Sequence, residues 1–249
     1  MRIGVVCEGP TDFHAIESFL GHSMSTNGIP VDFVPLQPEP DATSQGGWGQ
    51  VLLWLKDHPP ENRIQLFFTE GLFGGGLARV PFDGILIQLD SDILGDDGFG
   101  AYVKGKFDYT VADPPAAEQR AKEVRHILSH AARFEEMTQA DVARHVLAPA
   151  VESTETWCVA AFSPNGSDFE SLSGQVLVDE FMDALLRSES KPLSLRPYAK
   201  ANKTPSRRLS FCEAFAPQSG RVLAGCPRFR EAHDQLHSLA QSIAESGQD

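Results

Sequence analysis

The segment ILIQLDSD (85–92) has residue types and spacing that could do chemistry. An apolar run suited to a buried strand ends in two carboxylates, Asp90 and Asp92, with one serine between them. In an extended chain, side chains two residues apart point to the same side. Two carboxylates held this way repel each other, so one pKa rises, and a divalent cation relieves the repulsion. Hard oxygen ligands of this kind suit Mg²⁺ or Mn²⁺.

A second acidic segment follows the first apolar run of the chain. RIGVVC (2–7) is short and rich in Val and Ile, and it leads into EGPTD, which contains Glu8 and Asp12. Taken alone, Glu8 is most simply an acid in a turn, and Asp12 or Thr11 a helix cap. The carboxyl ends of parallel strands can lie side by side, however. We therefore expect Glu8, Asp90 and Asp92 to converge on one ion.

The elements that must position these acids alternate between strand and helix. Apolar, β-branched runs predict strands at 2–7, 31–36 and 84–89, with further strands at 63–70 and 152–162. Helical spacing of apolar residues predicts helices at about 11–24, 48–58, 115–133, 138–148, 167–190 and 227–245, and we expect an ordered loop at 93–112. This alternation indicates an α/β fold with a mostly parallel sheet flanked by helices.

The acidic and basic residues are unevenly distributed along the chain, which is 249 residues long with a net charge of −13. Residues 1–190 hold 12 Lys and Arg against 29 Asp and Glu, a net charge of −17. Residues 191–233 hold 9 against 2, a net charge of +7. A basic segment is a candidate for phosphate contacts, and a solvated surface is an equally good interpretation of it. We divide the chain into a core (1–190), with a helical insert (113–148), and a basic C-terminal extension (191–249) packed on the same domain.

The two acidic segments together resemble a known family. VVCEGPTDFHAI followed by ILIQLDSD is similar to the Toprim domain, whose pattern is a glutamate after the first strand and a DxD after a later one. Topoisomerases, bacterial primases and overcoming-lysogenization-defect (OLD) nucleases share this acidic metal-binding module. The finer resemblance is to the stand-alone DUF4276 proteins near the OLD branch, through ETW (155–157), YAK (198–200) and CPRF (226–229). The resemblance implies a Toprim-like, Rossmann-like fold.

The resemblance also implies a set of site residues. A first Mg²⁺ or Mn²⁺ would be held by Glu8, Asp90 and Asp92, and a second with Asp12 and Glu155. Glu152, Asp96 and Asp97 stay open as alternatives for the second ion. Lys200 would stabilise charge on the phosphorus during phosphodiester hydrolysis, although it is equally well one more surface cation. The candidates for contacts with nucleic acid are Arg196, Lys200, Lys203, Arg207 and Arg208.

Two functions follow as expectations. The first is a metal-dependent nuclease that acts on DNA or RNA, and the resemblance places it among effectors of anti-phage defence. The second is a non-enzymatic or partner-activated subunit whose acidic surface docks an ATPase. The apolar run near the N-terminus is five residues long and ends in an acid, and no stretch approaches the ~20 apolar residues of a membrane span. We therefore expect a cytoplasmic protein with no membrane partner.

Overall fold

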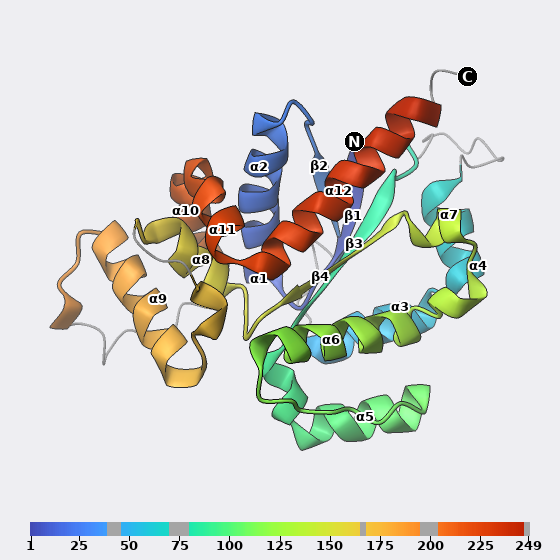
Figure 1. The fold of residues 1–249 in the computed structure, drawn as a ribbon, viewed down its shortest axis with the longest axis horizontal. Helices are drawn as coiled ribbons and strands as arrows, with labels where there is room; N and C mark the ends of the chain where they lie inside the picture. Colours follow the sequence, from blue (N-terminus) through green and yellow to red (C-terminus); the bar gives the residue numbers. More distant parts are fainter. Residues whose placement is uncertain (39–45, 70–79, 165–167, 195–203, 247–249) are drawn as a thin grey trace.

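The protein has an α/β fold built on a parallel sheet, as a computed structural model shows for residues 1–38, 46–69, 80–164, 168–194 and 204–246 (Figure 1). Within these residues the sheet has four strands in the order β2-β1-β3-β4. The strands are β1 (Arg2–Val6), β2 (Asp32–Gln37), β3 (Gly84–Asp90) and β4 (His145–Ala150). All neighbouring pairs are parallel, so the carboxyl ends of the strands lie at one edge.

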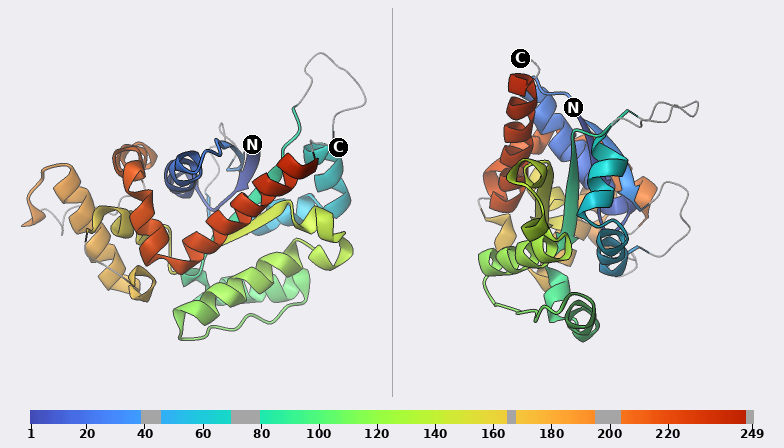
Figure 2. Two further views of the ribbon diagram at one scale, coloured as in Figure 1. Left: turned by 45° about the horizontal axis from the view of Figure 1, so that its top comes forward. Right: turned by 90° about the vertical axis from the view of Figure 1, so that its right-hand side faces the viewer.

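Helices cover both faces of this sheet. The helical segments are α1 (Pro10–Ala15), η1 (Ile16–Leu20), α2 (Gly21–Thr26), α3 (Trp48–Asp57), α4 (Pro60–Arg63), η2 (Ile64–Phe68), η3 (Asp92–Gly95), α5 (Asp97–Phe107), α6 (Ala117–Ala131), η4 (Phe134–Glu136), α7 (Gln139–Val142), α8 (Glu155–Phe162), η5 (Phe169–Ser171), α9 (Gly174–Ser188), α10 (Pro205–Phe215), η7 (Ala216–Gln218), α11 (Ser219–Gly225) and α12 (Pro227–Ser246). Helices α8 to α11 group at one side of the molecule, away from α4 and α7 (Figures 1 and 2). No helix in the described ranges has the length and apolar character needed to cross a membrane.

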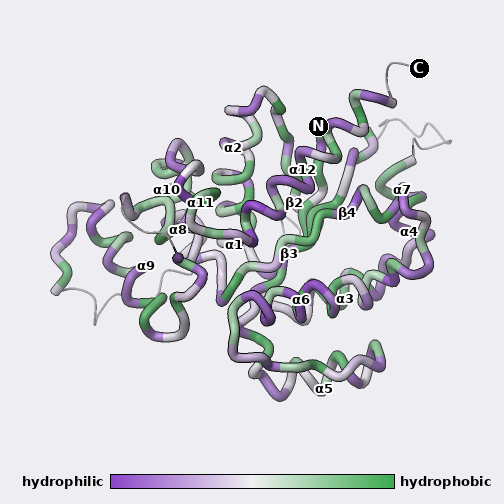
Figure 3. The backbone as a smooth tube through the Cα atoms, viewed as in Figure 1, coloured by the Kyte–Doolittle hydropathy of each residue, from purple (hydrophilic) through white to green (hydrophobic). Residues whose placement is uncertain are grey.

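The central strand β3 is buried on both sides, as strands of a parallel sheet are. Leu86 packs into one core, with side chains of η1, α8, α10 and α12. Its neighbour Ile87 packs into the other, with side chains of α3, η2, α5 and α6. Figure 3 shows the strands as a mainly hydrophobic stretch of the tube. Burial on both faces explains why GILIQL is apolar apart from Gln88 and does not alternate.

The chain leaves β1 and β3 in opposite directions across the sheet. From β1 it passes through α1, η1 and α2 to β2, and from β3 through α5 and α6 to β4, on the other side. The strand order therefore reverses between β1 and β3, where ligands of open α/β sheets bind. Glu8 follows β1, and Asp90 ends β3.

Several predicted elements differ from the structure. The predicted strand at 152–162 is helix α8, and the fourth strand, β4, begins within the predicted helix at 138–148. Helix α8 is buried almost all round, so its apolar run has no helical period to distinguish it from a strand. The predicted strand at 63–70 is π-helical over Ile64–Phe68. Helix α5 lies in the predicted loop at 93–112, and the Asp96 side chain caps it by accepting a 2.7 Å hydrogen bond from the Phe99 N–H.

Helix α12 covers the outer edge of β4 with a side-chain amide. Gln235 Oε1 accepts a hydrogen bond from the Leu147 N–H at 3.2 Å, and Gln235 Nε2 donates to the Leu147 carbonyl at 3.3 Å. The amide thereby takes the place of a neighbouring strand at an edge that would otherwise pair with another chain.

We predict that Gln235→Leu lowers the free energy of unfolding by about 1–2 kcal/mol, because both groups of Leu147 lose their partner. Gln241→Leu, at an exposed position of the same helix, is the matched control, with an expected change within about 0.5 kcal/mol. Urea denaturation measures both values. Equal effects would mean that the amide contributes nothing at this edge.

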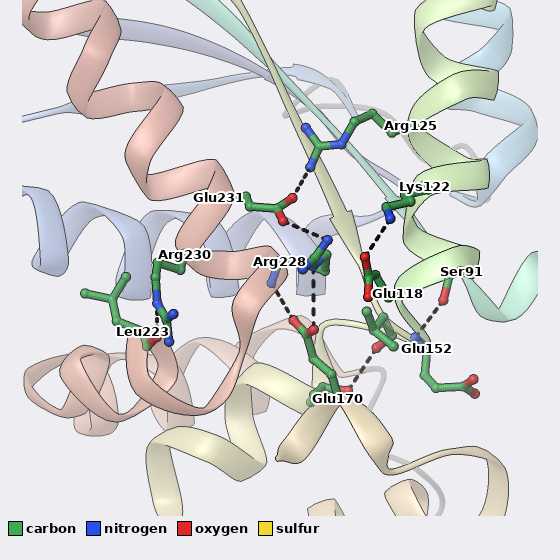
Figure 4. Close-up of polar contacts among 12 residues, drawn as sticks. Ser91, Glu118, Lys122, Arg125, Glu152, Glu170, Leu223, Arg228, Arg230 and Glu231 are labelled. Carbon is green, nitrogen blue, oxygen red and sulfur yellow. Dashed lines mark hydrogen bonds and ion pairs between the residues drawn. The ribbon is translucent and has the colours of Figure 1, made fainter. Parts of the chain in front are cut away.

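A buried carboxylate joins η5 to the start of α12 (Figure 4). Glu170 is 7% exposed and accepts a 2.7 Å hydrogen bond from the Arg228 N–H. The Arg228 side chain lies between Glu170, at 3.9 Å, and Glu231, at 2.7 Å, and Arg125 also pairs with Glu231. Burial raises the pKa of Glu170 to about 7, although the Arg228 N–H and charge act against it.

We predict that this group makes the protein less stable as pH rises. Folded Glu170 holds its proton more tightly than the unfolded chain does, so its contribution is full below about pH 4.5 and is lost as pH rises through about 7. Glu170→Gln should therefore gain about 2–3 kcal/mol relative to wild type over that window. Urea denaturation across pH tests this, with Glu118→Gln at an exposed position as control. A constant difference between E170Q and wild type would contradict it.

Candidate metal centre

The five acids predicted from the sequence lie around one pocket of about 490 Å³ at the carboxyl edge of the sheet. Its lining includes Glu8, Asp12, Asp90, Asp92 and Glu155. The remaining walls come from the turn after β1, Gly46 and Gly47 before α3, Ser153, helix α9 and Pro205. A larger pocket of about 1020 Å³ lies beside α12 at the opposite edge, and it contains none of the predicted residues.

Hydrogen bonds hold Glu8 at two points: its backbone carbonyl is bonded to the segment before α3, and its carboxylate is bonded to β3. Its carbonyl accepts a 2.7 Å hydrogen bond from the Gly47 N–H. A Cβ added at Gly46 would lie 2.3 Å from the same carbonyl oxygen, so a side chain at position 46 would force the two segments apart. The Glu8 carboxylate accepts a 2.9 Å hydrogen bond from the Asp90 N–H. The turn after β1 and the end of β3 are thus tied together at the point where the strand order reverses.

Asp90, at the end of β3, is a buried acid surrounded by other acids. Burial raises its pKa well above the ordinary value, and the charges of Asp12, Glu8, Asp92 and Glu155 raise it further. Gln88, which is fully buried two residues earlier on β3, donates a 2.6 Å hydrogen bond to Asp90 Oδ1. The end of β3 therefore holds a carboxylate in a place that favours a proton or a cation beside it.

Asp12 and Glu155 are held by buried donors. Thr154 Oγ1 donates a 2.6 Å hydrogen bond to Asp12 Oδ1 in the first turn of α1. Arg208 donates to Glu155 and, at 3.3 Å, to Thr154 Oγ1. Burial on its own would raise the pKa of Glu155, but the Arg208 charge and hydrogen bonds from Ser153 and Arg208 outweigh it and lower the pKa. This side of the pocket therefore contains a carboxylate kept ionised by the protein.

The three alternative ligands lie outside the pocket. The Glu152 carboxylate accepts from the Gly174 N–H at 3.3 Å and lies 3.8 Å from Arg120. Figure 4 shows its backbone N–H bonded to Ser91 while its carboxylate points elsewhere. Asp96 caps α5, and Asp97 is exposed in the first turn of that helix. Of the four candidates that were open for a second ion, only Glu155 lines the pocket.

The predicted basic residues fall into two groups. Arg196, Lys200 and Lys203 lie outside the described residues. Of the two that the structure describes, Arg207 pairs with Glu189 and, by hydrogen bonding, lowers the pKa of that acid to about 2. Arg208 is 1% exposed, so it cannot contribute to a surface for nucleic acid as expected. Arg208 makes its contacts inside the fold, where it pairs with Glu155.

Several polar residues of the site were missed by the sequence reasoning, among them Gln88 and Thr154. Gln88 is a polar residue within the apolar run ILIQL, and it orients Asp90. Thr154 precedes α8 and orients Asp12. A polar side chain in a strand that is buried on both faces needs a partner, so Gln88 was a signal available from the sequence. Thr154 offered none, because its partner is 142 residues away.

The donor set suits a hard divalent cation by its chemistry. Carboxylate oxygens are preferred by Mg²⁺ and Mn²⁺. Burial first and neighbouring negative charges second raise the pKa of Asp90, and a bound cation would relieve both effects. No group of three or more His, Cys, Asp or Glu side chains in the described ranges is already arranged as ligands of one ion. Binding of a cation would therefore require side chains of the pocket to turn toward it.

We predict that Asp90→Asn stabilises the metal-free protein. The change removes a charge that burial and four neighbouring acids disfavour, and the amide oxygen can still accept from Gln88. The free energy of unfolding at neutral pH should rise by about 1–3 kcal/mol, measured by urea denaturation with a chelator present. Asp97→Asn, outside the pocket, should change it by less than about 0.5 kcal/mol. A loss of stability in D90N would show that the Asp90 charge is well compensated.

Comparisons with known proteins found no relative of this chain. No family model matches the chain, and neither a curated protein nor a solved structure matches it.

Proposed function

We propose that the protein is a Mg²⁺- or Mn²⁺-dependent nuclease of Toprim-like type. The observation that carries the proposal is the pocket at the reversal of strand order, around which carboxylates follow three different parallel strands. A glutamate after β1 and a DxD at the end of β3 are the two parts of the Toprim pattern, and these two strands are neighbours in the sheet. Acids that are far apart in the sequence thus meet where ligands of such sheets bind.

Glu8, Asp90 and Asp92 would hold the cation. A bound divalent ion would supply Lewis-acid stabilisation of the phosphoryl oxygens and a water of lowered pKa. The chain's own contribution is to fix the ligands: Gln88 and the Asp90 N–H hold Asp90 and Glu8 relative to each other. The described walls of the pocket carry five carboxylates, so a phosphate group would be repelled until a cation is present. This favours a reaction that depends strictly on metal.

Hydrolysis is favoured over the transesterification of topoisomerases, which uses a tyrosine nucleophile. Tyr102 packs against Trp48 with ring centroids 5.4 Å apart, and the Tyr109 hydroxyl hydrogen-bonds to Glu123 at 3.3 Å. Neither tyrosine lines the pocket. Tyr198 lies outside the described residues. No tyrosine of the described residues is thus placed to attack a phosphate in the pocket, and water is the nucleophile that the pocket favours.

We predict that the purified protein nicks or linearises supercoiled plasmid in Mn²⁺ or Mg²⁺ but not in a chelator. Asp90→Asn should reduce the rate by more than about 100-fold, above the loss typical of residues that only support a ligand. Asp97→Asn is the matched control and should retain the wild-type rate, since its side chain lies outside the pocket. Gel electrophoresis of plasmid, with single-stranded RNA tested in parallel, measures both.

Two results would count against the proposal. Equal cleavage by D90N and wild type would trace the activity to a contaminant or to another site. An absence of cleavage on DNA and on RNA, in protein shown to bind Mn²⁺, would mean that the pocket serves a purpose other than hydrolysis by the isolated chain.

A further inference from the structure

A guanidinium is buried against one wall of the acidic pocket. The Arg208 side chain is 0% exposed, and it comes from α10, a helix that packs on α1 and α8. It pairs with Glu155, donates to Thr154 Oγ1 at 3.3 Å and to Cys158 Sγ at 3.7 Å, and lies over the Phe181 ring at 4.7 Å. Every one of these partners belongs to α8, its preceding residue or α9.

These contacts fix the cation in place. A guanidinium is always charged, and its planar group can bond to two acceptors while stacking on an aromatic ring. A buried charge is stable only when it is paired, so removing Glu155 from Arg208 would leave an uncompensated charge inside the protein. Glu155 is therefore the anchor of Arg208 in this fold.

The same guanidinium reaches a second acid through one hydroxyl. Thr154 Oγ1 accepts from Arg208 and donates at 2.6 Å to Asp12 Oδ1. Glu155 and Asp12 were the two acids assigned to a second metal ion by the resemblance. Both are instead oriented by one protein cation, directly in the case of Glu155 and through Thr154 in the case of Asp12.

We propose that Arg208 takes the place of a second divalent cation, so that the pocket binds one Mg²⁺ or Mn²⁺ ion and Glu155 is not a metal ligand. This inference rests on the proposed metal-dependent function and deepens it. Arg208 is then a positioning residue that supplies fixed positive charge beside the single ion. The ion is held on the side of the pocket formed by Glu8, Asp90 and Asp92.

Isothermal titration calorimetry with Mn²⁺ on the full chain tests the proposal without any assay of activity. The expected stoichiometry is one ion for wild type and one for Glu155→Gln, with a dissociation constant that changes by less than about tenfold. Asp90→Asn should weaken binding by about 100-fold or more, beyond the loss expected from a supporting residue. Asp97→Asn is the matched control and should bind as wild type does.

A second arm of the experiment removes the guanidinium and looks for an additional bound Mn²⁺ ion. In Arg208→Met, Glu155 loses its cation next to Asp12 and Asp90, and a second, weaker Mn²⁺ should bind, raising the stoichiometry to two. The double variant R208M/E155Q should return it to one. Circular dichroism and thermal unfolding first establish that each variant is folded. If R208M or E155Q does not fold, the number of ions bound by wild type decides the question, since two ions would overturn the proposal.

The possible results separate this inference from the proposed function. Two ions on wild type, falling to one in E155Q, would overturn the single-ion inference and leave the metal-dependent function standing. If E155Q lost Mn²⁺ binding to the same extent as D90N, Glu155 would be a ligand. That result would likewise overturn the single-ion inference. A folded R208M that binds one ion would show that Arg208 does not occupy the place of a cation. Absence of Mn²⁺ binding to wild type would overturn both proposals.

Discussion

The repulsion between carboxylates around Asp90 is the constraint on which the organisation of this pocket depends. A parallel sheet brings its carboxyl ends to one edge, so acids placed after β1, β3 and β4 must come close together. Their charges raise the pKa of Asp90 in addition to the effect of burial. The fold has to offset this cost with donors from outside the cluster, and those donors determine which acids remain available to a ligand.

The negative charge of the acids is compensated differently on the two sides of the pocket. Asp12 and Glu155 are held by the hydroxyl of Thr154 and the guanidinium of Arg208, all in or next to the core shared by α1, α8 and α10. Asp92, by contrast, is exposed at the start of η3. The pocket thus has one side held by groups of the core and another side where Asp92 reaches solvent, from which a ligand could enter.

The sequence predicted the α/β class and the acids of the pocket because both depend on local patterns. Apolar runs that end in Glu8 or Asp90 can be recognised within a few residues, and parallel pairing then implies that they meet. The partners of these acids could not be found in this way. Arg208 pairs with a residue 53 positions away, and its burial follows from how α10 packs on α8, so it looked like one more member of a basic segment. Packing also buries α8 almost all round, so its apolar run shows no helical period and looked like a strand.

The position of Arg208 also bears on why a basic C-terminal segment accompanies an acidic core. Of its described basic residues, Arg207 pairs with Glu189, Arg208 with Glu155 and Arg228 with Glu170 and Glu231. Within the described residues, these three arginines thus neutralise acids of residues 1–190 and of α12. Charge segregation along a sequence therefore does not by itself indicate a basic surface, because the two segments can fold against each other and cancel locally.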